Sequence, residues 1–144
     1  MTSSGDSPVD PVELDIGPRA VIDNRYEILS PLGAGGMGWV FKARDRILGE
    51  TVALKVLRSD LGLDAERTER FRSEIRFARR VRHRNVCGLH EYGEDGNLHY
   101  IAMEYVEGSD LKQVVDERGP LPWDEAYRAS IQCAEGLAAI HEMG

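Results

Sequence analysis

The chain has 144 residues, 42% of them hydrophobic and 7% aromatic, which is enough for one ordinary folded domain. Its two cysteines, Cys87 and Cys133, lie far apart, so they indicate neither a disulfide framework nor a zinc site and suit a reducing cytoplasm. The formal net charge of −7 argues against a protein that binds nucleic acid mainly through phosphate contacts. No apolar run approaches the roughly 18 residues of a membrane span. We therefore expect a cytoplasmic domain with no nucleic-acid partner and no membrane segment.

The basic residues are unevenly distributed along the chain. The segment from Glu66 to Arg84 holds eight arginines and three glutamates, and the rest of the chain is correspondingly acidic. The whole chain has only three lysines, which are Lys42, Lys55 and Lys112. Because lysine is scarce here, a lysine at a position suited to phosphate chemistry is informative.

The N-terminal half predicts a tail followed by three strands. Residues 1 to about 22 are rich in Ser, Asp, Pro and Gly and show no apolar period, which predicts a mobile tail. Three β-like runs follow at residues 26–29, 39–44 and 51–57. A glycine-rich loop joins the first two runs, and a short turn at residues 45–49 joins the second to the third. This order predicts an antiparallel meander.

The middle of the chain predicts one helix and a hairpin. Asp64 is suited to cap the helix, whose apolar residues recur at helical spacing. Two further strands, residues 86–92 and 98–106, flank a strong turn signal at Asp95–Gly96. We expect these two strands to extend the sheet.

Two helices are predicted at the C-terminal end. Ser109 is suited to cap a short helix that ends at Gly119, and Pro122 stands near the start of the last helix. This last helix carries apolar and small residues on more than one side, which is typical of a helix buried between neighbours. No later residues can cover it. We therefore expect that the chain is cut here, and that the bare face favours self-association.

Residues 33–38 read GAGGMG and fit the pattern GxGxxG, which is weak evidence by itself. Glycines let backbone N–H groups approach phosphate oxygens, although a flexible β-turn explains the same residues. A dinucleotide-binding fold would need a helix directly after the glycines. The β-forming residues Trp39, Val40 and Phe41 stand there instead, so that fold is excluded.

The residues after the glycines carry a more specific signal. The pattern continues to Val40 as GxGxxGxV, and residues 52–55 read VALK. These two motifs match the protein kinase signature of GxGxxGxV followed by V-A-I-K, with Leu for Ile. From about Tyr26 to Gly144 the chain resembles the N-terminal half of a Ser/Thr protein kinase catalytic domain of the bacterial, eukaryotic-like type.

This resemblance implies an α+β fold and a domain organisation. The fold is a kinase-like N-lobe, with a five-stranded antiparallel sheet and helix C, followed by a hinge and the first two helices of the C-lobe. After the tail at residues 1–22, the N-lobe takes residues 23–103 and the hinge residues 104–108. The truncated start of the C-lobe takes residues 109–144.

The resemblance also implies roles for charged residues. Lys55 would contact the α- and β-phosphates of ATP and pair with Glu74, which lies 19 positions later on the predicted helix. The alternatives are a solvated strand lysine and a surface glutamate paired with arginine. Neighbouring arginines could draw Glu74 outward, an arrangement that the family has in its inactive state. Ala78 stands where the family usually has a larger apolar residue, which weakens the expectation that this helix is held inward.

Further residues are implied around the nucleotide. Val40 and Ala53 would sandwich the adenine ring, Met103 would be the gatekeeper, and the backbones of Glu104 and Val106 would hydrogen-bond to adenine. Asp110 would contact ribose, or would simply be a charge at a helix N-terminus. The full set implied to bind nucleotide is Leu32, Gly33, Ala34, Gly35, Gly36, Met37, Gly38, Val40, Ala53, Lys55, Met103, Glu104, Val106 and Asp110.

Some kinase motifs are not present in these 144 residues. The family places its catalytic Asp and its Mg²⁺ ligands in H-R-D-x-x-x-x-N and D-F-G, which follow the last helix. ATP and Mg²⁺ are thus the implied cofactors and a protein with Ser or Thr the implied substrate, but this chain supplies no metal ligand and should be inactive alone. The alternative is a naturally short pseudokinase or binding module that acts through nucleotide or a partner.

Overall fold

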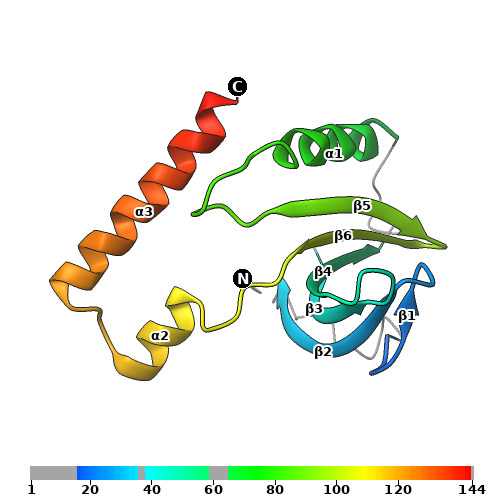
Figure 1. Ribbon diagram of the computed structural model, residues 1–144, viewed down its shortest axis with the longest axis horizontal. Helices are drawn as coiled ribbons and strands as arrows, with labels where there is room; N and C mark the ends of the chain where they lie inside the picture. The colour runs from blue at the N-terminus through cyan, green and yellow to red at the C-terminus, as the bar shows by residue number, and fades with distance from the viewer. Residues whose placement is uncertain (1–15, 36–37, 59–64, 144) are drawn as a thin grey trace, which may run out of the picture.

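The structure is a computed structural model that describes residues 16–35, 38–58 and 65–143. One antiparallel sheet of six strands, in the order β1-β2-β3-β4-β6-β5, forms its centre. The strands are β1 Val21–Ile22, β2 Tyr26–Gly35, β3 Gly38–Asp45, β4 Thr51–Arg58, β5 Leu89–Asp95 and β6 Leu98–Glu104. The helices are α1 Ala65–Ala78, α2 Leu111–Arg118 and α3 Trp123–Glu142. Figure 1 shows a curled sheet with α1 lying along β5, and with α2 and α3 to one side.

The pleat of β3 separates two faces of the sheet. Phe41 and Ala43 point into the hydrophobic core, which they share with Leu54 and Val56 of β4. Val40 and Lys42 alternate with them, so they face the opposite side and are half-buried. Burying a side chain as large as Leu54 stabilises the fold by about 2 kcal/mol, so this core holds the meander together.

Arg25, Asp45 and Glu91 form a charged cluster at the end of the sheet where β2 begins and β3 ends. The buried Asp45 pairs with Arg25 at 2.7 Å between carboxylate and guanidinium, and Arg25 also contacts Glu91 at 2.8 Å. Asp45 Oδ1 accepts hydrogen bonds from the backbone N–H groups of Ile47 and Leu48, at 2.9 and 3.1 Å. The hydrogen bond from Arg25 lowers the pKa of the Asp45 carboxyl to about 2. Every polar atom of this buried carboxylate therefore has a partner.

The structure extends the ordered sheet into the predicted tail. Ile22 is 4% exposed and belongs to the core, while Ile16 and Ala20 pack against it. Residues 16–22 were therefore wrongly assigned to the tail, because a two-residue strand is too short to show a period-2 pattern. Residues 1–15 and the proposed cap Asp64 lie outside the described residues.

Several predicted element boundaries also change: β2 runs to Gly35 rather than ending at residue 29, and β6 ends at Glu104 rather than at residue 106. The α2 helix is capped by Asp110 rather than Ser109, because Asp110 Oδ1 accepts from the backbone N–H of Gln113 at 2.8 Å and Gln113 Oε1 accepts from the backbone N–H of Asp110 at 3.1 Å. The β5 strand begins at Leu89 rather than at residue 86. A turn precedes it, in which Asn85 Nδ2 donates to the carbonyl of Gln132 on α3 at 3.0 Å.

Candidate functional site

The strand register gathers four of the predicted site residues on one face. Val40 on β3 lies opposite Lys55 on β4, and Ala53, two residues before Lys55, lies opposite Met103 on β6. Directly opposed residues of neighbouring strands face the same side, and so do residues two apart on one strand. Three separate strands thus build a single surface from these four side chains. The core residues occupy the other face.

This surface has the chemistry that a flat apolar ring with a charged substituent requires. Ala53 is 7% exposed and adds only a methyl group, while its neighbours Val40 and Met103 are half-buried. The Lys55 ammonium group stands on the same face, two residues along β4. Apolar contacts therefore lie next to a cation suited to phosphate.

Two glycines of the loop above this surface serve different purposes. Gly33 pairs with Val40, and a Cβ added to Gly33 would meet nothing within 4 Å. The space beside Gly33 is thus open, and packing alone does not require a glycine there. Gly38 has a φ of 149°, and a Cβ there would lie 2.3 Å from the carbonyl oxygen of Val56. Gly38 is therefore required by the close approach of β4, whatever binds nearby. Residues 36 and 37 lie outside the described residues.

Lys55 and Glu74 are not brought together. Lys55 is half-buried on β4, Glu74 is exposed on α1, and no ion pair joins them within the described part of the chain. The contacts that hold α1 against the sheet come from other residues. Ile75 is buried between them, and the Arg72 guanidinium bonds to Glu94 of β5.

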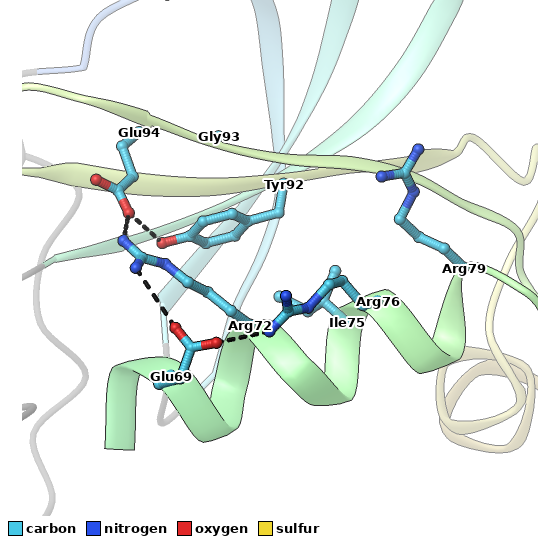
Figure 2. A pocket seen from close by; sticks show the side chains of 8 residues that line it. All are labelled: Glu69, Arg72, Ile75, Arg76, Arg79, Tyr92, Gly93 and Glu94. Atoms are coloured by element: carbon cyan, nitrogen blue, oxygen red, sulfur yellow. Dashed lines mark hydrogen bonds and ion pairs between the residues drawn. The ribbon is translucent and has the colours of Figure 1, made fainter. Parts of the chain in front are cut away.

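An open pocket of about 560 Å³ lies between α1 and β5. Figure 2 shows Arg72 bridging Glu69 and Glu94, with the Tyr92 hydroxyl donating to Glu94 at 2.9 Å. The hydrogen bond from Arg72 lowers the pKa of Glu94. None of the predicted nucleotide-binding residues lines this pocket. The arginine-rich segment at residues 66–84 supplies Arg72, Arg76 and Arg79 to this pocket, but the sequence pattern alone does not predict a pocket there.

In the predicted hinge, residues 104–108, the backbone of Glu104 is already hydrogen-bonded, whereas that of Val106 has no partner in the part of the chain that the structure describes. The backbone N–H of Glu104 donates to the carbonyl of Gly88 at 2.8 Å, and the carbonyl of Glu104 accepts a weak hydrogen bond from the Cys87 thiol at 3.4 Å. Partial desolvation, with the nearby Glu104 carboxylate, raises the pKa of that thiol. Val106 is exposed, and its backbone makes no hydrogen bond to any of the described residues.

The remaining predicted residues lie at the rim. Leu32 is exposed on β2, next to Gly33. The Asp110 carboxylate caps α2, so the helix-terminus alternative describes what Asp110 does in this structure. Among residues 16–35, 38–58 and 65–143, no cluster of three or more His, Cys, Asp or Glu is arranged to hold a metal ion. No helix in the same ranges has the length and apolar character to cross a bilayer.

Comparison with known proteins identifies the family. The family described as Protein kinase domain matches residues 26–144. The chain is 44% identical over 124 residues to the serine/threonine-protein kinase pkn2 of Myxococcus xanthus, covering 86% of this chain and 15% of that protein. It is 41% identical over 127 residues to the serine/threonine-protein kinase PrkC of Bacillus subtilis, covering 88% of this chain and 19% of PrkC.

Solved structures of kinase domains have the same fold as this chain. The crystal structure of the Mycobacterium tuberculosis PknI kinase domain superposes with a TM-score of 0.76 at 30% identity, over 89% of this chain and 52% of that domain. The chain thus spans about half of a solved kinase domain and under a fifth of these two curated relatives. It belongs to the protein kinase family and corresponds to the N-terminal part of a bacterial-type Ser/Thr kinase domain.

Proposed function

We propose that this chain is the ATP-binding part of a kinase that transfers the γ-phosphate of ATP to Ser or Thr hydroxyls of a protein. One observation carries the proposal, which is that Val40, Ala53, Lys55 and Met103 share one sheet face. ATP supplies the phosphoryl group, and Mg²⁺ offsets its negative charge. The free thiols Cys87 and Cys133 suit the reducing cytoplasm, where ATP is available.

Each residue then has a physical role. Val40 and Ala53 hold the adenine ring between apolar groups, and Met103 limits how far the ring extends across this face. The carbonyl of Glu104 and the backbone of Val106 hydrogen-bond to the adenine edge. The glycine loop with Leu32 covers the phosphates, and Lys55 compensates their charge. Asp110 is close in sequence to the hinge, and its carboxylate contacts ribose while Oδ1 caps α2.

Glu74 requires a conformational step in this proposal. It must turn toward Lys55 to hold that ammonium group in place, whereas α1 here leaves it exposed. The arginine contacts on the β5 side of α1 favour the outward arrangement. Pairing of Lys55 with Glu74 therefore belongs to an active state that differs from this structure.

A calorimetric titration with ATP tests nucleotide binding. Lys55→Met removes the cation beside the phosphates, so the affinity for ATP should fall about 10-fold or more. Lys112→Met is the matched control, because Lys112 is an exposed lysine that pairs with Asp116 on α2, away from the proposed site. Equal affinities for the unmodified chain and Lys55→Met would contradict the role of Lys55.

The 144-residue chain should not transfer phosphate alone. It contains neither an H-R-D-x-x-x-x-N sequence nor D-F-G. In kinases the residues of these motifs orient the acceptor hydroxyl and hold Mg²⁺, so the 144 residues lack the groups for both tasks. Incubation of the purified chain with radiolabelled ATP and a general protein acceptor should leave the acceptor unlabelled. Labelling above that of a Lys55→Met control would overturn this expectation.

A second candidate function is that of a binding module that associates through α3. Trp123 is 83% exposed and Tyr127 57%, and both lie on a helix whose only buried residue is Gly136. Large exposed apolar surfaces of this kind usually meet a partner. Self-association would appear as a concentration-dependent mass in sedimentation. A monomer at all concentrations that binds no apolar dye would exclude it.

A further inference from the structure

Lys42 and Tyr105 make a contact that the nucleotide-binding roles do not use. The Lys42 ammonium nitrogen lies 4.7 Å from the centre of the Tyr105 ring, within the range of a cation–π interaction. Lys42 stands opposite Ala53, two residues after Val40, and therefore belongs to the face of the candidate nucleotide site. Tyr105 belongs to the hinge. The contact thus joins the strand above the adenine site to the segment at its edge.

The burial of both side chains distinguishes this contact from an incidental one. Among residues 104–108, Tyr105 alone is half-buried and the other four are exposed. Lys42 is half-buried as well, and it has no carboxylate partner in the described ranges. Lys112, by contrast, has a side chain 84% exposed and pairs with Asp116 at 2.5 Å. The Lys42 ammonium therefore relies on the aromatic ring where Lys112 relies on a carboxylate.

We propose that Lys42 and Tyr105 are positioning residues that fix the distance between β3 and the hinge. This inference rests on the proposed function, because that distance matters only if an adenine ring lies between Val40 and the backbone of Val106. An adenine ring needs apolar contacts from the strand and hydrogen bonds from the hinge at the same time. A hinge that is already held against β3 loses less freedom when the ring binds, which increases affinity.

The proposal makes a distinctive prediction about ligands. The contact between Lys42 and Tyr105 lies at the adenine end of the proposed site. Loss of either residue should therefore lower the affinities for adenosine and for ATP by the same factor, about 2- to 5-fold. Lys55→Met should weaken ATP alone, since adenosine has no phosphate. The double variant Lys42→Met/Tyr105→Leu should bind no more weakly than either single variant, because one contact is lost in all three.

A measurement without nucleotide tests the contact itself. The chain has three lysines, so selective ¹³C labelling of the lysine ε-methylene carbon should give three NMR signals, one for each lysine. We expect one signal shifted upfield by the ring of Tyr105, absent in Lys42→Met and returned to an ordinary position in Tyr105→Leu. Tyr105→Phe retains a ring and should keep the shift. Three signals at ordinary positions in the unmodified chain would overturn the proposal.

Calorimetry of the same variants with adenosine and ATP tests the consequence. The positioning role is supported if Lys42→Met lowers the affinities for adenosine and ATP equally while Lys112→Met leaves both affinities unchanged. Unchanged adenosine affinity in Lys42→Met overturns the positioning role even if the NMR contact exists. Should the unmodified chain bind neither ligand, the proposed function fails, and the positioning role fails with it.

Discussion

At the scale of single residues, the clearest lesson concerns glycines that share one motif but differ in cause. Gly38 has no room for a side chain, because the carbonyl of Val56 lies where a Cβ would stand. A Cβ added to Gly33 would instead meet no atom within 4 Å. The backbone therefore requires glycine at position 38 and not at position 33, where the proposed reason is a bound nucleotide.

Alanine substitutions of these two glycines should have opposite signatures. Gly38→Ala should lower the free energy of unfolding by at least about 2 kcal/mol, because the clash adds to an unfavourable φ. Gly33→Ala should leave stability within about 1 kcal/mol and weaken ATP binding instead. Urea unfolding and ATP calorimetry measure the two effects. A stable Gly38→Ala variant would contradict the packing argument.

A second residue-scale prediction concerns Asp45 and pH. Since Arg25 lowers the pKa of Asp45 to about 2 in the folded chain, the ionised carboxylate stabilises the fold above pH 4, and this stability is lost as pH falls from about 4 toward 2. Asp45→Asn should therefore reduce the free energy of unfolding by about 2 kcal/mol at pH 7, and by about half of that at pH 3. Urea unfolding of both proteins at the two pH values measures this. The same deficit at both would exclude linkage to Asp45.

At the scale of elements, the sequence predicts the strands that have several alternating residues and the turn that has a clear signal. It does not predict the elements whose position depends on particular side-chain contacts. The three strands of the meander and the Asp95–Gly96 turn are confirmed. The strand β1 was missed, because two residues carry no period. Ser109 and Asp110 are both residue types that cap helices, so the sequence does not distinguish them. The hydrogen bond from the backbone N–H of Gln113 to Asp110 identifies Asp110 as the cap.

The placement of α1 gives an element-scale prediction. Ile75 is buried between α1 and the sheet, while Arg72 and Glu94 are about two-fifths exposed. Ile75→Ala should lower the free energy of unfolding by about 2–4 kcal/mol, because it leaves a cavity. Glu94→Gln should change stability much less, since solvent screens an exposed ion pair. Thermal and urea unfolding compare the two. A larger loss in Glu94→Gln would show that the ion pair, and not packing, holds α1.

At the scale of the whole molecule, the register of three strands explains how a sequence motif becomes a site. The order of Val40, Ala53 and Lys55 along the chain predicted the family, but their common face follows from the antiparallel pairing of β3, β4 and β6. The position of Glu74 could not be predicted in this way, because it depends on how α1 rests on β5. The Lys42–Tyr105 contact was not predicted either, since no motif includes it.

We propose above that ATP binds on the face formed by Val40, Ala53 and Met103. Methyl-selective NMR of the chain during titration with ATP tests this binding site most directly. We expect the methyl signals of these three residues to shift early, while those of Leu54 and Val56 on the core face stay in place. Shifts centred on Ile75, in the pocket between α1 and β5, with none at Val40 and Ala53, would contradict it.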